Sequence, residues 1–284
     1  MLRVLRCLAF FALALGLGFA HDPALAASDQ SLAQQSATNY LHAAAVPMQT
    51  GDYDRAVEIL EEGLERSLAT PEMLTLLGEA YRRQGRLNEA ADAAEEALTM
   101  EPSYAPAHLQ LGDVYMDLGW LESAADSYRA ALAADDAAAA ARSRLVRCLT
   151  EAGHPRQAEQ ECRAFLAREE TPVLCLDLAE ALARQQRHQA ALTACDRALE
   201  LDPRCAAAHA RRARLFCELG DYEAATAASR AALAIDPQSA EAHASLGLAS
   251  AHRDDFMGAY SHAVKAEQGG VDMSEVWSLL QRQN

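Results

Sequence analysis

Cysteine is the side chain whose number and placement suggest chemistry most directly in this sequence. Six of the seven cysteines fall in the middle of the chain, at Cys148, Cys162, Cys175, Cys195, Cys205 and Cys217. An even number of cysteines favours disulfides if the protein is exported, whereas buried thiols simply fill alanine-sized gaps. No two cysteines have the C-x-x-C spacing that is typical of redox catalysis. Buried thiols and at least one disulfide therefore both stay open.

The other catalytic residue types lack the patterns that catalysis needs. The sequence has no G-x-S-x-G, no H-E-x-x-H and no phosphate-binding glycine loop. His108, His209 and His243 recur at equivalent places in a repeat, so they lie too far apart to converge on one metal ion. We expect a non-enzymatic protein with no catalytic residue, no cofactor and no metal site.

The elements that carry these side chains follow a period of 34 residues. Residues 71–104 and 105–138 align over their whole length, with Leu77-Gly78-x-x-Tyr81 over Leu111-Gly112-x-x-Tyr115. A fixed period of this length is the signature of stacked supersecondary units.

Each period predicts two helices. Apolar residues recur at i, i+3, i+4 and i+7 in two runs, which indicates amphipathic helices. Gly85 lies between the runs, where a helix can end in the left-handed conformation, and Pro102 cannot continue the second helix. The unit is therefore a helix, a tight turn and an antiparallel helix, and it needs neighbours to bury both faces.

The unit resembles the tetratricopeptide repeat (TPR), which has L-G-x-x-Y in the first helix, A-L at positions 27–28 and proline at position 32. Alanine fills position 20 seven times, at Ala56, Ala90, Ala124, Ala158, Ala191, Ala225 and Ala259. Glycine fills position 15 five times, at Gly51, Gly85, Gly119, Gly153 and Gly220. The resemblance implies an all-α fold: a right-handed α-solenoid of about seven helix-turn-helix units with a C-terminal capping helix.

The resemblance covers residues 37–270. The units are 37–70, 71–104, 105–138, 139–171, 172–205, 206–239 and 240–270, and residues 271–284 are the expected capping helix. In the first unit, Pro47 should kink or shorten the first helix. Residues 27–36 are polar and are expected to form a linker, or a frayed extra helical turn.

The N-terminal 26 residues have the features of a secretory signal peptide. Arg3 and Arg6 precede a 14-residue apolar run, and Ala24-Leu25-Ala26 is a typical cleavage signal. The run is shorter than the ~20 residues of a membrane-spanning helix. We expect an exported, periplasmic protein, and the alternative is an inner-membrane anchor that is never cleaved and faces the periplasm.

The charge distribution bears on partners. The formal net charge is −16, which argues against binding nucleic acid or anionic lipid. Residues 37–138 carry a net −13, whereas residues 139–239 are neutral. A groove with an acidic N-terminal half and arginines along its middle could hold an extended peptide or a helix.

The resemblance also implies which residues line a concave groove. In the family these are first-helix positions 2, 5, 9, 12 and 13. In this chain they correspond to Glu72, Glu79, Arg82, Arg83, Asp113, Met116, Asp117, Arg147, Glu151, Glu180, Arg184, Arg214 and Glu218. Position 24 faces the next unit's first helix, so Cys162 and Cys175 are the pair expected to form a disulfide, if one forms.

These features favour a protein–protein interaction scaffold that binds a peptide or helical segment, without a small-molecule substrate. The resemblance to exported bacterial TPR proteins implies a role in the assembly of an envelope, secretion or pilus complex. Two alternatives remain: a membrane-anchored assembly factor, and a redox or metal-binding protein that uses the cysteines of residues 139–239.

Overall fold

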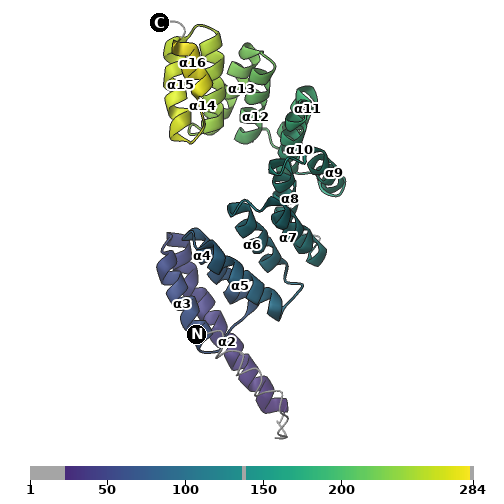
Figure 1. Cartoon of the computed structure of the whole chain (residues 1–284), viewed down its shortest axis with the longest axis vertical. Coiled ribbons are helices and arrows are strands. Elements are labelled where there is room, and N and C mark those ends of the chain that lie inside the picture. Colours follow the sequence, from purple (N-terminus) through teal and green to yellow (C-terminus); the bar gives the residue numbers. More distant parts are fainter. Residues whose placement is uncertain (1–22, 136–138, 282–284) are drawn as a thin grey trace.

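The chain folds into an elongated stack of helices. The computed structural model describes residues 23–135 and 139–281, which form fifteen helices, α2 to α16, and no strand. The stack runs from α2 at one end to α16 at the other (Figure 1). The expected all-α solenoid is confirmed.

The helices come in consecutive antiparallel pairs, each followed by the first helix of the next pair. The pairs are α2 (Pro23–Thr50) with α3 (Tyr53–Glu65), α4 (Pro71–Arg83) with α5 (Leu87–Met100), α6 (Ala105–Asp117) with α7 (Leu121–Ala134), α8 (Ala139–Glu151) with α9 (Pro155–Leu166), α10 (Pro172–Arg184) with α11 (His188–Leu201), α12 (Ala206–Glu218) with α13 (Tyr222–Ile235), and α14 (Ala240–His252) with α15 (Phe256–Gln268). The final helix is α16 (Ser274–Gln281). From α4 onward, the first helix of each pair begins at the first residue of the 34-residue unit.

The turns within the pairs explain the glycines at position 15. All five of these glycines have φ between 75° and 79°. The pairs α10–α11 and α14–α15 have Gln186 and Asp254 in the same place, at φ 62° and 61°. The left-handed conformation is therefore required at this position even where the residue is not glycine.

The first pair differs from the sequence prediction. Residues 27–36, expected to form a linker or a frayed extra helical turn, belong to α2, which is 28 residues long. Pro47 lies inside this helix, which continues to Thr50, so the proline does not shorten it. The alanines of this segment favour helix, and helix formation prevails over its polar character. Of the predicted signal peptide, residues 1–22 lie outside the described residues.

Small residues let the two helices of a pair approach closely. A methyl group added at Gly112 would lie 2.5 Å from Cε1 of Tyr128, whose side chain is 1% exposed. Ala90, Ala124, Ala158 and Ala191 at position 20 are fully buried. The core therefore consists mostly of small buried side chains, with a few large ones such as Tyr128 among them.

The first helices form the inner layer of the stack. Neighbouring first helices contact each other directly in most of the stack, as in α4–α6, α8–α10 and α12–α14, whereas each second helix packs mainly between first helices. Because the first helices lie closer together, the stack curves with them on its concave side. At the C-terminal end α16 packs on α14 and α15, with Val276 buried. No helix among the described residues has the length and apolar character needed to cross a bilayer.

Candidate binding groove

Three connected pockets lie along the concave side, and the first helices form most of their walls. The N-terminal pocket, of about 380 Å³, is lined by Arg82, Asp113, Met116, Asp117, Tyr128, Arg144, Arg147 and Glu151. The middle pocket, of about 260 Å³, is lined by Arg147, Thr150, Glu151, Asp177, Glu180, Arg184, Arg211 and Arg214. The C-terminal pocket, of about 440 Å³, lies between α12, α14 and the start of α16. Arg147 and Glu151 belong to the first two pockets and Arg214 to the last two, so the three form one continuous groove.

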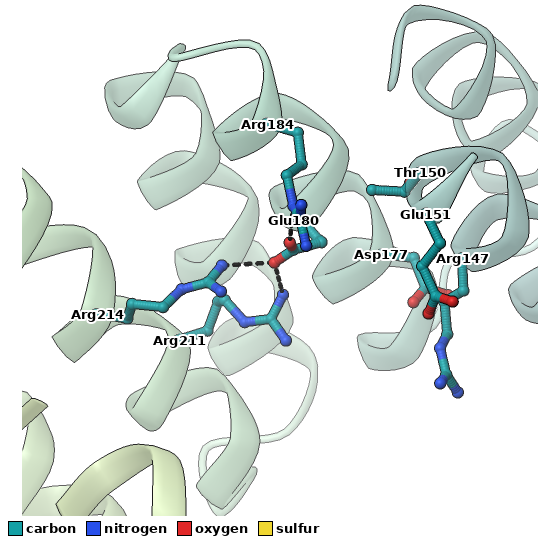
Figure 2. Close-up of a pocket in the computed structure, with 8 residues that line it drawn as sticks. All are labelled: Arg147, Thr150, Glu151, Asp177, Glu180, Arg184, Arg211 and Arg214. Atoms are coloured by element: carbon teal, nitrogen blue, oxygen red, sulfur yellow. Dashed lines mark hydrogen bonds and ion pairs between the residues drawn. The ribbon is translucent and has the colours of Figure 1, made fainter. Parts of the chain in front are cut away.

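In the middle pocket three arginines converge on one carboxylate (Figure 2). Arg184 Nε donates to Glu180 Oε1 at 2.8 Å, from the next turn of α10. Arg211 Nη1 and Arg214 Nη2, both on α12, donate to Glu180 Oε2 at 2.5 Å each. The carboxylate thus ties α10 to α12.

These contacts keep Glu180 ionised. Burial alone would raise the pKa of Glu180, but the hydrogen bonds and charges of the three arginines outweigh it and lower the pKa to about 2. Such charge-assisted hydrogen bonds are roughly twice as strong as neutral ones.

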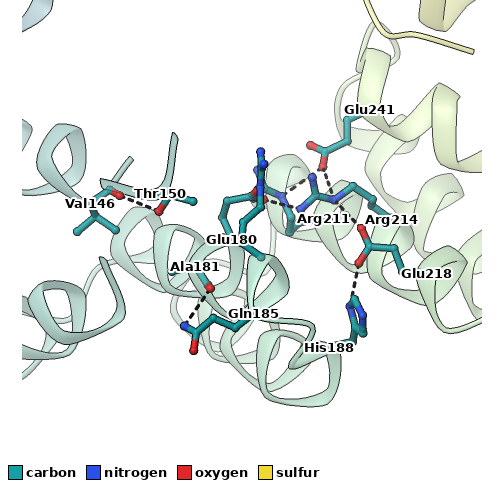
Figure 3. Close-up of polar contacts among 11 residues, drawn as sticks. Val146, Thr150, Glu180, Ala181, Gln185, His188, Arg211, Arg214, Glu218 and Glu241 are labelled. Atoms are coloured by element: carbon teal, nitrogen blue, oxygen red, sulfur yellow. Dashed lines mark hydrogen bonds and ion pairs between the residues drawn. The ribbon is translucent and has the colours of Figure 1, made fainter. Parts of the chain in front are cut away.

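The same ion-pair network continues toward the C-terminus (Figure 3). Arg211 Nε lies 3.2 Å from Glu241 Oε1 on α14, and Arg214 Nε lies 3.7 Å from Glu218 Oε1. His188 Nδ1, at the start of α11, is 2.9 Å from Glu218 Oε2. The arginines of α12 therefore join three neighbouring units.

Arg147 differs from the other arginines of the middle pocket. Its side chain is exposed and, within residues 23–135 and 139–281, no hydrogen bond or ion pair joins it to another side chain. Figure 2 shows Arg147 on the α8 side with Glu151 and Asp177, apart from the arginines around Glu180. It is thus the groove cation that is available to a carboxylate from outside.

Asp177 is a buried acid beside Arg147. The side chain is 8% exposed and accepts a hydrogen bond of 2.5 Å from Ser143 Oγ. Burial raises the pKa of Asp177 to about 6, and the hydrogen bond and the charges of Arg147 and Arg211 only partly oppose this. The charge of the groove next to Arg147 therefore changes between pH 5 and pH 7.

In the N-terminal pocket the acids are largely neutralised from within. Tyr128 OH donates to Asp113 Oδ1 at 2.9 Å, and Arg144 Nη1 lies 3.0 Å from Asp113 Oδ2. Arg82 Nη1 pairs with Asp117 at 2.9 Å. The expected acidic half of the groove is therefore less acidic than its sequence charge indicates.

Most of the sequence-predicted groove residues come together. Ten of the thirteen line the three pockets: Arg82, Asp113, Met116, Asp117, Arg147, Glu151, Glu180, Arg184, Arg214 and Glu218. The other three lie on α4 outside these pockets; there Arg82 and Arg83 both donate to Glu79, and Glu72 is exposed. That these residues contact a partner stays a prediction.

The structure adds groove residues that the sequence prediction missed. Arg144, Asp177 and Arg211 each occupy position 6 of a first helix. Position 6 lies one helical turn before position 9, so both positions share a face. Polar residues at position 6 in consecutive units were the signal that could have identified them.

The recurring histidines have a structural role. Nε2 of His108, His209 and His243 lies 2.9, 3.4 and 3.1 Å from the carbonyl oxygen of Pro102, Pro203 and Pro237, respectively. Because a carbonyl only accepts, each imidazole donates to the turn that precedes its helix. Within the described residues no group of three or more His, Cys, Asp or Glu side chains is placed to hold a metal ion.

The six cysteines among the described residues are free thiols in this structure, which holds no disulfide between Cys162 and Cys175, the pair named as possible. Cys162 Sγ instead donates to the carbonyl oxygen of Leu174 at 3.0 Å, and Cys175 is buried in a separate contact cluster with Ala198 and Ala208. Burial raises the pKa of Cys162 to about 12, which disfavours the reactive thiolate.

Comparison with known proteins points to one family. A sequence model of the tetratricopeptide repeat matches residues 48–105 and 176–240, and a second model with the same description matches residues 105–137. No curated protein matches the chain significantly.

Solved structures share the fold at low sequence identity. A tetratricopeptide repeat protein from Parabacteroides merdae is 21% identical with a TM-score of 0.72, over 87% of this chain and 98% of that one. The Cut9–Hcn1 hetero-tetramer of APC/C gives 19% identity and a TM-score of 0.66, over 84% of this chain and 48% of that one. PilW, described as a type IV pilus biogenesis factor, is 19% identical with a TM-score of 0.61, over 74% of this chain and 98% of that one.

Proposed function

The chain belongs to the tetratricopeptide repeat family, and on that premise we propose that it is a non-enzymatic scaffold whose concave groove binds a segment of a partner protein. The repeats of this family generally serve as scaffolds that bind proteins or peptides. Stacked units hold a fixed curved surface on which contact residues stand one unit apart.

The observation that carries this proposal is the continuous groove with Arg147 at the junction of two pockets. An exposed guanidinium with unused donors can bind a partner carboxylate through two parallel hydrogen bonds. Arg184 and Arg214, which the sequence also favoured as partner contacts, are already held by Glu180. We therefore assign the partner's acidic side chain to Arg147.

We further propose that the protein acts outside the cytoplasm, in assembly of an envelope, secretion or pilus complex. The N-terminal sequence supports export, and the fold shared with the pilus biogenesis factor PilW supports an assembly role. If Met1 is retained in the purified protein, the second candidate, a membrane-anchored assembly factor, replaces the exported one. N-terminal sequencing separates the two.

Charge reversal at Arg147 tests the binding site. Arg147→Glu should weaken the affinity for the main partner captured by the wild-type protein about tenfold, which corresponds to about 1.4 kcal/mol. Arg230→Glu is the matched control, because Arg230 is an exposed arginine on the second helix α13. Equal affinity for wild type and Arg147→Glu would place the binding surface elsewhere.

A further inference from the structure

The C-terminal pocket differs in chemistry from the rest of the groove. Its floor includes Cys217, Leu248, Met273 and Val276, from α12, α14 and the segment that leads into α16. The middle pocket has no such floor, since acidic and basic side chains and Thr150 line it. An apolar side chain that enters the groove would therefore be best accommodated at the C-terminal pocket.

The rim of this pocket is acidic. Glu218, Asp272 and Glu275 lie around it, and Arg214 is its one basic lining residue among the described residues. The guanidinium of Arg214 is already bound to Glu180 at 2.5 Å. The hydroxyl of Ser274 and, at 2.9 Å, its backbone N–H both donate to Asp272 Oδ1; these hydrogen bonds lower the pKa of Asp272 and keep it ionised. Because Glu218 already lies 2.9 Å from His188 Nδ1, a cation beside the apolar side chain would meet chiefly Asp272 and Glu275.

We infer that the C-terminal pocket binds a large apolar side chain of the partner segment, flanked by a lysine or arginine, and that residues 271–276 are part of the binding surface as well as of the cap. This inference rests on the proposed function, since it concerns the same partner segment. Two observations support it: Arg214 lines both the middle and the C-terminal pocket, so the groove is continuous there, and the rim of the C-terminal pocket is acidic.

The packing of the helices sets the spacing within the partner. The C-terminal pocket lies between α12 and α14, and Arg147 lies on α8, two to three first helices away. Packed helices are about 8–10 Å apart, which gives about 20–25 Å between the two contacts. An extended chain rises about 3.3 Å per residue. The partner's acidic residue and its apolar–basic pair should therefore be separated by about six to eight residues.

Selection from a random 16-residue peptide library displayed on phage tests this inference without a known partner. Peptides selected by the wild-type protein should share an acidic residue and, at this spacing, a large apolar residue next to Lys or Arg. Glu275→Lys should remove the preference for the basic residue, and Ala244→Met, which fills the pocket, should remove the apolar preference. Glu223→Lys, an exposed change on α13, is the control and should select the wild-type motif.

The binding of a synthetic peptide of the selected sequence gives the magnitude. We expect its Kd to rise about three- to tenfold with Glu275→Lys and to stay unchanged with Glu223→Lys. Thermal unfolding followed by circular dichroism shows that each variant is folded. In the library selection, Arg147→Glu should remove only the preference of the selected peptides for an acidic residue.

The outcomes separate the two proposals. A selected motif with the acidic residue alone, or one that Glu275→Lys and Ala244→Met leave unchanged, would overturn the C-terminal pocket and leave the groove proposal intact. A library from which the wild-type protein selects nothing would count against both.

Discussion

At the scale of single residues, Glu180 ties the first helices of two neighbouring units, α10 and α12, together across the groove. Its carboxylate accepts hydrogen bonds from Arg184, Arg211 and Arg214, and its side chain is 19% exposed. Arg214 at position 9 and Arg184 at position 13 of their units were predictable as groove residues from the repeat register. Their convergence on one carboxylate was not, because it depends on how α10 and α12 are rotated against each other.

Replacing this carboxylate should destabilise the fold in a pH-dependent way. Since the pKa of Glu180 is lowered from 4.5 to about 2, its contribution is complete above pH 4.5 and is lost as the pH falls toward 2. Glu180→Gln should reduce the free energy of unfolding by about 2–3 kcal/mol at pH 7, and by about half as much at pH 3.

Urea denaturation at the two pH values measures this difference. Glu223→Gln, an exposed change on α13, is the control and should leave stability within about 0.5 kcal/mol. A loss of equal size at pH 7 and pH 3 would mean that the charge of Glu180 is not what stabilises the cluster.

Asp177 should have the opposite effect on stability. Its pKa is raised from 3.8 to about 6, so the cost of ionising it in the folded state develops as the pH rises from 4 to 6 and is complete above that. Asp177→Asn, which can still accept from Ser143, should stabilise the protein by about 1–3 kcal/mol at pH 8 and hardly at pH 4. Parallel stability curves for wild type and variant would contradict this.

At the scale of elements, the sequence predicted the helix pairs from α4 to α15 well because their apolar spacing and turn glycines repeat. At residues 27–36 the polar composition left a linker and a frayed helical turn both open, whereas in the structure these residues belong to the long helix α2. The α16 helix was expected as a cap, but its place beside a pocket needed the packing of α14 against α12.

The turn between α10 and α11 offers a stabilising substitution. Gln186 has φ 62°, a conformation that costs a non-glycine residue about 1–2 kcal/mol. Gln186→Gly should therefore raise the free energy of unfolding by about 0.5–1 kcal/mol, since glycine's greater freedom in the unfolded chain offsets part of the gain. Gln186→Ala, which also loses the side chain, should give no such gain. Equal stability of the two variants in urea would show that the turn is not strained.

The contact between α6 and α7 should not tolerate a methyl group. Gly112→Ala would bring Cβ to 2.5 Å from the buried ring of Tyr128, and we expect a loss of about 1–3 kcal/mol in stability. Gly247→Ala is the comparison, because the nearest atom there is Ala263 N at 3.3 Å, and the loss should be smaller. Thermal unfolding of both variants measures it, and similar melting temperatures would contradict the close approach.

At the scale of the whole molecule, curvature and charge together decide what the surface offers. First helices pack against first helices, so the side chains of several units face one groove. The formal net charge of −16 describes the chain as a whole and does not predict the local charge of the groove. Internal pairs such as Arg82 with Asp117 and Arg144 with Asp113 neutralise the acids there.

Site-specific photo-crosslinking in the source organism tests most directly whether partners bind on the concave side. A photoreactive amino acid is placed at residue 147 in the groove, and in a second variant at residue 230 on α13. We expect covalent adducts with a partner protein from residue 147 and none from residue 230. Adducts from residue 230 with none from residue 147 would show that the convex surface, and not the groove, binds partners.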